Sequence, residues 1–286
     1  MAISRRQFGA AVAVGLTTAG TILADDQKQT PLRVIAYNIY KYTGWPNNRL
    51  RAKQAVAKGQ MAKWLAMELA LYKPDIINFS ESPSEKLTKE VAKLLGMNHV
   101  RFPSGGNWPG TLLSHNEIVE SQNTSLDGER PKEFFTRHWG RATIKLYSGD
   151  LLIVHSAHLY PTADPTIRLR EIRAMLGAMN ADLEAGRSML LIGDLNHNPD
   201  TEEYRLWIDA GWLDTFAKVG KGEGPTIKAD IPKWRIDYVM AAGPIADRNV
   251  ESRPLFEGAF WLNIADKASF ALSDHLPQLA VFQSTQ

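Results

Sequence analysis

Several apolar segments of the sequence end in a polar residue that could hold a metal ion or move a proton. Each segment is rich in β-branched and aliphatic residues, a composition that predicts a strand. The residues placed in this way are Asn38, Glu81, His158, Asp194, Asn196, Asp237, Asp274 and His275. Carboxylates are ligands for hard divalent ions, and imidazole changes its charge near neutral pH. The set could therefore bind a metal ion, or its members could neutralise one another.

Burial of an unpaired carboxylate costs several kcal/mol, about the stability of a small domain. Repetition of the pattern therefore predicts that these side chains meet at one edge of the sheets. Alternation along the strand places His158 on the face of Leu152 and Val154, so packed neighbours would hold it. His155 lies on the opposite face, and we interpret it as a structural residue.

Each position also has a structural alternative when it is taken alone. Asn, Asp and Ser form local turns and caps at strand ends without any functional role. The alternatives are a turn at Asn38 or Glu81, an Asx turn at Asp194 before Asn196, an ion pair of Asp237 with Arg235, and a cap at Asp274. The functional interpretation is favoured because all of them occur at the same kind of place.

The elements that would position these residues alternate loosely along the chain. Apolar runs predict strands at 32–40, 75–81, 111–114, 141–147, 151–159, 188–192, 235–241 and 278–282. Helical spacing predicts one helix from Leu50 to about Lys73, and further helices at 85–95, 166–185 and 200–210. No Pro- or Gly-rich linker divides this part of the chain. The simplest layout is one domain with two packed sheets and outer helices.

The first 24 residues are predicted to be an export signal. Ser4-Arg5-Arg6-Gln7-Phe8 resembles the twin-arginine signal, and the apolar run that follows is too short for a convincing membrane span. Residues 25–31 are a polar linker in this interpretation, and residues 32–286 are the folded domain. We therefore expect a periplasmic or secreted bacterial protein that uses the twin-arginine export machinery.

Composition excludes several classes of function. The 286-residue chain has no Cys, so it has no disulfide framework, thiolate zinc site, iron–sulfur cluster or cysteine nucleophile. The formal charge of +2 comes from 33 basic and 31 acidic residues. Removal of the signal removes two arginines and leaves 31 of each, so the mature chain is formally neutral. A neutral chain argues mildly against tight binding of duplex DNA.

With these segments in view, the chain resembles the endonuclease/exonuclease/phosphatase superfamily, which includes pancreatic-type deoxyribonuclease and neutral sphingomyelinases. The matching segments occur in the family's order over nearly the whole mature chain. They are Ala36-Tyr37-Asn38, Glu81, His158-Leu159, Gly193-Asp194-Leu195-Asn196, Arg235-Ile236-Asp237-Tyr238 and Ser273-Asp274-His275. One departure is Ser80, since many members have Gln before the metal-binding Glu.

The resemblance implies a four-layer α/β/β/α sandwich with two packed, mostly antiparallel mixed sheets. It also implies hydrolysis of a phosphoester with Mg²⁺, or Mn²⁺ in its place, on Glu81, with Asp274 as a second candidate ligand. By the same resemblance, Asp194 and Asn196 activate the attacking water, and Asp237 pairs with His275 and raises its pKa. Asn38, His158 and Asn196 would bind the phosphate. Ser273-Asp274-His275 is not interpreted as a nucleophilic triad, because adjacent residues point apart.

The substrate is left open by the sequence. Nucleic acid, a phospholipid headgroup and a small phosphoester are all compatible with these residues, and we expect a monomer. No acidic residue occurs between Asp26 and Glu68, whereas this stretch has eight basic residues. They could form a positive rim beside Asn38 or a solvated helix face; Arg168, Arg170 and Arg173 are a weaker case. The alternative function is a non-catalytic binding protein on the same fold.

Overall fold

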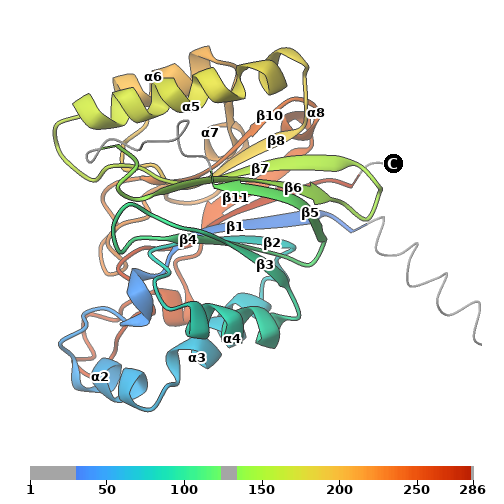
Figure 1. Ribbon diagram of the computed structural model, residues 1–286. Helices are drawn as coiled ribbons and strands as arrows, with labels where there is room; N and C mark the ends of the chain where they lie inside the picture. The colour runs from blue at the N-terminus through green and yellow to red at the C-terminus, as the bar shows by residue number, and fades with distance from the viewer. Residues whose placement is uncertain (1–29, 124–133, 285–286) are drawn as a thin grey trace, which may run out of the picture.

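Two six-stranded sheets form the centre of the computed structural model, which describes residues 30–123 and 134–284 (Figure 1). The first sheet has the order β11 (Asn249–Pro254), β12 (Gln278–Phe282), β1 (Leu32–Asn38), β2 (Ile76–Ser80), β4 (Gly110–Ser114) and β3 (Asn98–Phe102). The second has the order β5 (Glu117–Asn123), β6 (His138–Lys145), β7 (Leu151–His158), β8 (Met189–Asp194), β10 (Asp237–Ala242) and β9 (Leu213–Asp214). Only β1–β2 and β7–β8 pair in parallel among the described strands.

Helices cover the outer face of each sheet, so the molecule has four layers (Figure 1). The first sheet is covered by α2 (Leu50–Ala57), α3 (Met61–Ala70) and α4 (Glu85–Leu95), and the second by α5 (Thr166–Glu184) and α6 (Glu202–Asp209). The shorter helices are η1 (Tyr40–Tyr42), α7 (Thr215–Val219), α8 (Pro244–Asp247) and η2 (Gly258–Phe260). This arrangement confirms the predicted α/β/β/α sandwich.

Three apolar cores hold the layers together. The inner faces of both sheets meet in a core that includes Val34, Leu112, Val154 and Ile192, all fully buried. The other two cores lie between each sheet and its own helices. Side chains alternate along a strand, so every central strand contributes to two cores. Rigid strands with two packed faces can hold the residues at their ends in fixed positions.

Some elements differ from the sequence prediction. The single helix expected from Leu50 to Lys73 is two helices, because Gly59 takes a left-handed conformation (φ 64°) that ends α2. The strands β3, β5 and β11 were missed, since mostly polar sequence hides their alternation. The predicted export signal and residues 25–29 of the linker lie outside the described residues. Within the described part, no helix is long and apolar enough to span a bilayer.

Candidate active site

The register of the second sheet places three predicted site residues side by side. His158 is the last residue of β7 and lies opposite Asp194, the last residue of the parallel strand β8. Asp237 is the first residue of β10, which runs antiparallel to β8, so it also lies opposite Asp194. The edge of this sheet therefore presents an imidazole and two carboxylates in adjacent positions.

Asp194 is the residue on which both sheets converge. Its Oδ2 accepts a hydrogen bond of 3.0 Å from Asn38 Nδ2, which belongs to the first sheet. The same oxygen lies 3.6 Å from His158 Nε2 and 3.8 Å from His275 Nε2. The other oxygen accepts a 3.1 Å hydrogen bond from the backbone N–H of Asn196. The Asx turn considered as an alternative to function is thus present together with the site contacts.

Gly193 allows the two central strands to approach each other at this point. Its φ of 144° is a conformation that L side chains rarely adopt, and a Cβ there would lie 1.9 Å from the carbonyl oxygen of Ala157. The glycine of the Gly-Asp motif is therefore a packing requirement. It permits β7 and β8 to pair beside the residues that end them.

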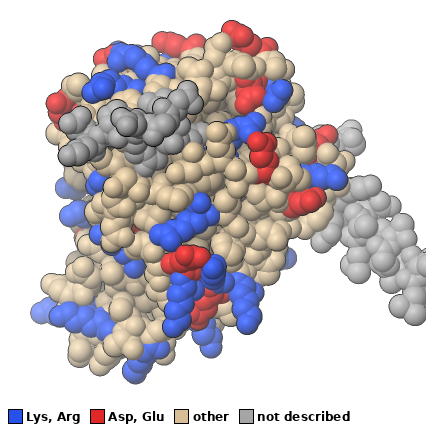
Figure 2. All heavy atoms as spheres, in the orientation of Figure 1, with Lys and Arg blue, Asp and Glu red and all other residues tan. Residues whose placement is uncertain are grey.

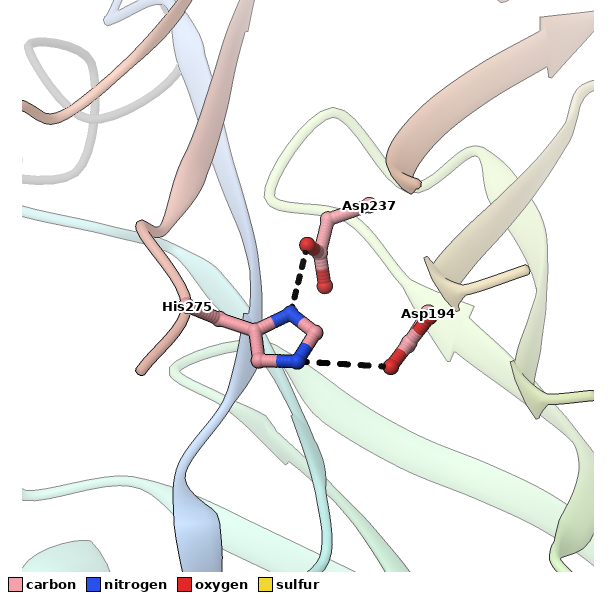
Figure 3. Close-up of side chains that lie close together, drawn as sticks. All are labelled: Asp194, Asp237 and His275. Carbon is pink, nitrogen blue, oxygen red and sulfur yellow. Dashed lines mark hydrogen bonds and ion pairs between the residues drawn. The ribbon is translucent and has the colours of Figure 1, made fainter. Parts of the chain in front are cut away.

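His275 and Asp237 form a buried pair, shown in Figure 3 with Asp194 on the far side of the imidazole. His275 Nδ1 donates to Asp237 Oδ2 at 2.8 Å, and the two residues are 5% and 0% exposed. Burial alone would lower the pKa of His275. The charge of Asp237, its hydrogen bond and the charge of Asp194 outweigh burial and raise that pKa well above its usual value. These contacts therefore favour the positively charged form of the imidazole.

His158 and Asp194 have the opposite protonation tendencies. Burial lowers the pKa of His158 well below its usual value, and the nearby His138, Arg137 and His275 add to this effect. Burial and the neighbouring Asp237 raise the pKa of Asp194 to about 7. The site thus combines an imidazole that favours its neutral form, an imidazole that favours its charged form, and a carboxylate whose pKa lies near neutral pH.

Glu81 has the features of a metal ligand. It follows β2 in a left-handed conformation (φ 54°), which is strained for a residue with a side chain. Its Oε2 is buried and has no hydrogen-bond partner. Burial raises the pKa of Glu81, and the negative charge of Asp274 acts in the same direction. A hard cation between these carboxylates would satisfy the unpartnered oxygen, so both residues fit the ligand roles that the resemblance implies.

A second set of groups could also contact a cation. One ligand atom from each of Asp194, Asp237 and His275 lies within 4.8 Å of the others, and Asp237 Oδ1 is buried without a partner. However, the imidazole and one Asp237 oxygen are already hydrogen-bonded to each other. The buried oxygen of Glu81 has no partner of this kind, so Glu81 fits a cation better than this second set does.

The contacts exclude one of the structural alternatives and agree with the interpretation of Ser273. Arg235 pairs with Asp214 (Nη2 to Oδ2, 2.6 Å) rather than with Asp237. Ser273 Oγ donates to the backbone oxygen of Asn38 at 2.6 Å, which agrees with a structural serine. These contacts leave Asp237 for His275 and give Ser273 a role in joining the site's segments.

His155 and Asn196 are also placed by their contacts. His155 accepts from Trp139 Nε1 at 3.3 Å in the core under α5, as expected for a structural histidine. The amide nitrogen of Asn196 donates to the backbone oxygen of Leu159 at 3.0 Å. That contact ties the segments after β7 and β8 together and commits one of the two side-chain N–H groups of Asn196.

The basic residues singled out in the sequence have different surroundings. Figure 2 shows Lys and Arg side chains at the lower left, where Figure 1 places α2. Arg51 and Lys53 of α2 are exposed, as expected for a solvated helix face. Lys41 of this segment acts on Glu81 electrostatically. Arg168 is buried against Glu203 (2.7 Å), so it does not belong to a positive rim.

Three functional candidates were missed by the sequence reasoning. Trp108 lies between β3 and β4, Arg137 precedes β6, and Glu171 lies on α5. None of them ends an apolar run, so the pattern that found the other site residues does not apply. A tryptophan in a Pro-Gly turn was the only available signal.

The fold and site together define an α/β/β/α sandwich of the kind that hydrolyses phosphoesters. The model of the Endonuclease/Exonuclease/phosphatase family matches residues 36–275, and the chain belongs to this family. A comparison with curated proteins finds no significant match.

Solved structures of low sequence identity share the fold. A Bacteroides thetaiotaomicron protein of the same family superposes with a TM-score of 0.67 at 17% identity, covering 89% of this chain and 98% of the other. A mannosyl-6-phosphatase from Bacteroides thetaiotaomicron VPI-5482 gives 0.68 at 15% identity, with 87% and 98% covered. Truncated Caenorhabditis elegans TDP2 gives 0.65 at 16% identity, with 90% and 99% covered.

Proposed function

We propose that the protein is an exported, divalent-metal-dependent phosphoester hydrolase. The observation that carries this proposal is the convergence on the Asp194 carboxylate, within 3.0–3.8 Å, of Asn38, His158 and His275 from both sheets. Such a cluster is expensive to bury and provides a base, an acid and neutral donors in one place. Membership of the Endonuclease/Exonuclease/phosphatase family supports the reaction class.

The residues have complementary tasks in this proposal. A divalent ion on Glu81 and Asp274, when bound, would stabilise negative charge on the phosphate and the leaving oxygen. Asp194 orients a water molecule and accepts its proton, and its raised pKa makes it a stronger base than an ordinary aspartate. Asp237 holds His275 in the charged form with Nε2 directed toward Asp194, so Nε2 can donate to a phosphate oxygen.

Asn38 and His158 are the remaining phosphate-binding residues in this proposal. Their side chains are buried (2% exposed each), so their orientations are set before a substrate arrives. Asn196 helps to orient Asp194, because its backbone N–H holds the carboxylate that accepts the proton. The same preorganisation would be difficult to explain in a binding protein, which has no need of a buried base with a pKa near 7.

Export and localisation belong to the same proposal. The twin arginines and the apolar run of residues 1–24 support transport of the folded protein to the periplasm or beyond, by the twin-arginine machinery. An Arg5→Lys/Arg6→Lys double variant should remain in the cytoplasm of a bacterial host, with a Lys28→Arg control still exported. Equal export of the twin-arginine variant would contradict this route.

An activity panel tests the reaction class. The purified protein, from which residues 1–24 have been removed, would be assayed on plasmid DNA, RNA, sphingomyelin, phosphatidylinositol phosphates and simple phosphoesters. We expect hydrolysis with Mg²⁺ or Mn²⁺, loss of activity in EDTA, and recovery when the ion is restored. Absence of hydrolysis of every substrate, with Asp194→Ala behaving like the wild type in ligand binding, would favour the non-catalytic alternative.

A further inference from the structure

Two cationic side chains lie over the Trp108 indole near the candidate site. Lys41 Nζ lies 3.5 Å from the centroid of the Trp108 ring, and Arg137 Cζ lies 4.5 Å from it. The three residues come from η1, from the segment before β4 and from the segment before β6, which are far apart in sequence. Contacts of this kind between cations and an aromatic ring are attractive and fix the position of the charges.

Neither cation has an ion-pair partner in the part of the chain that the structure describes. Within residues 30–123 and 134–284, no carboxylate lies within ion-pair distance of Lys41 or Arg137, and Arg137 Nε is buried without a hydrogen-bond partner. Burial lowers the pKa of Arg137, while Glu81, Tyr160 and Asp194 act in the opposite direction. The guanidinium therefore lies within electrostatic reach of both the candidate metal ligand Glu81 and the candidate base Asp194, and its Nε–H has no partner among the described residues.

The backbone positions Lys41 beside Glu81 at some cost. Tyr40, Lys41 and Tyr42 all have positive φ values (46°, 58° and 61°), which are unfavourable for residues with side chains. Two contacts retain this turn: Lys41 N–H donates to the backbone oxygen of Glu81 (3.1 Å), and Tyr40 N–H donates to Asn38 Oδ1 (3.2 Å). Strain that persists beside site residues points to a role for the side chain that it positions.

A carboxylate on α5 holds the segment that carries Arg137. Glu171 accepts from the backbone N–H of Phe135 (2.7 Å) and from that of Tyr160 (3.0 Å). It thereby joins the segment before β6 to the segment after β7. Both cations are thus fixed by contacts to residues of the site or to a helix that supports it.

The chemistry of the phosphate indicates what these two cations are for. Arg137 lies within electrostatic reach of Glu81 and Asp194, and Lys41 lies within reach of Glu81. Both cations therefore lie beside the groups that are proposed to hold the metal ion and to activate the water. A phosphodiester has one negative charge, but a phosphomonoester carries close to two at neutral pH and has three terminal oxygens. The second charge and third oxygen require additional donors.

We propose that Lys41 and Arg137, spaced by Trp108, bind the extra charge and oxygen of a phosphomonoester, so that the site selects terminal phosphates over diesters. The inference rests on the proposed phosphoester hydrolysis and names its substrate class. Trp108 serves as the spacer between the cations. Because its ring already contacts two cations, it is poorly placed to stack on a nucleobase, which favours an anion over an aromatic leaving group at this position.

The test compares one monoester with one diester of the same leaving group. kcat/KM would be measured for p-nitrophenyl phosphate and bis(p-nitrophenyl) phosphate in the wild type, Arg137→Met, Lys41→Met and the double variant. Loss of a charged hydrogen bond should reduce monoester hydrolysis by about 10–100-fold in Arg137→Met, but diester hydrolysis by less than about threefold. The double variant should lose the preference for the monoester.

Matched controls separate this effect from the loss of any surface cation. Arg170 lies over Phe134 (5.2 Å) and Lys228 over Trp45 (6.0 Å), and both are exposed. Arg170→Met and Lys228→Met should leave the ratio of the two kcat/KM values unchanged. If Arg137→Met does not fold, Lys41→Met provides the same comparison.

Binding of a non-reacting anion gives a second measurement. By calorimetry, inorganic phosphate should bind the wild type more tightly than dimethyl phosphate, and the double variant should bind both equally. If neither ester is hydrolysed, the proposed function fails. If both are hydrolysed and the variants lose the two activities in parallel, or dimethyl phosphate binds as tightly as phosphate, the function stands and the selection of monoesters is overturned.

Discussion

Replacement of Asp237 by Asn tests how the site keeps its acid charged. Asp237 is fully buried, and its 2.8 Å contact with His275 Nδ1 is the main attraction that raises the pKa of that imidazole. Asn has nearly the same shape but no charge, so burial would prevail and His275 would become neutral at pH 7. Loss of a positioned general acid lowers the rate by about 10²–10⁴-fold.

The pH dependence of stability gives the sign expected for the Asp237→Asn replacement. A histidine whose pKa is raised on folding stabilises the protein below its usual pKa, and this contribution is lost as pH rises through the folded value. The stability difference between wild type and Asp237→Asn should therefore be largest in acid and narrow in alkali. Removal of one partner of a buried ion pair costs about 3–5 kcal/mol when the other partner stays charged. The stability difference should be smaller than this here, because His275 can lose its proton.

The assay is kcat for an activated phosphoester from pH 5 to 9, with denaturant unfolding at the same pH values. The activity of Asp237→Asn relative to that of the wild type at the same pH should rise as pH falls, because protonation of His275 in the variant then depends on solution pH, whereas protonation of Asp194 lowers the activity of both proteins. A wild-type pH profile in the variant would refute the reasoning. Full recovery with excess metal ion would refute it as well, since it would make Asp237 a metal ligand in the set with Asp194 and His275.

Three further perturbations have defined outcomes. Burial raises the pKa of Glu171 from 4.5 to about 7. The contribution of this carboxyl group to the free energy of unfolding, measured in urea, should therefore fall by up to about 3 kcal/mol between pH 4.5 and 7. Glu171→Gln lacks the ionisable group, so this part of the pH dependence should be absent from the variant. Glu81→Gln should weaken Mn²⁺ binding, measured by calorimetry, by at least about 10–100-fold, the loss that follows removal of a residue that merely supports a metal ligand. Unchanged affinity would show that Glu81 is not part of the metal site. Gly193→Ala should cost more than about 3 kcal/mol or prevent folding, as circular dichroism would show, because its Cβ would meet Ala157 O at 1.9 Å; a wild-type melting curve would contradict the packing argument.

The positions of the acidic and imidazole groups could be predicted because these groups lie at the ends of strands. Asp194 and His158 close apolar runs, and parallel pairing brings such ends together at one edge of a sheet. Asn38 ends an apolar run in the same way in the first sheet, and the structure brings its amide to Asp194. The family membership and sandwich fold expected from these segments are confirmed.

The remainder depends on contacts that have no local signal. The helix break at Gly59 is a single left-handed residue within otherwise helical spacing. Arg137 and Trp108 lie outside the regular elements, and only the tertiary fold brings them to Lys41. The high pKa of Glu171 arises from burial under two loops, which a helix pattern cannot indicate. The sequence therefore predicts the placement of site residues that end strands, whereas the placement of those in connecting segments is known only from the folded structure.

The most direct test of the central claim is to follow oxygen from the solvent. The claim is that Asp194 directs water to phosphorus, so hydrolysis of a phosphoester in H₂¹⁸O should place ¹⁸O in the phosphate-containing product. Mass spectrometry would detect this label, and Asp194→Asn should slow its appearance by about 10²–10⁴-fold with the fold retained. Label in the released alcohol, or a wild-type rate in Asp194→Asn, would contradict the account.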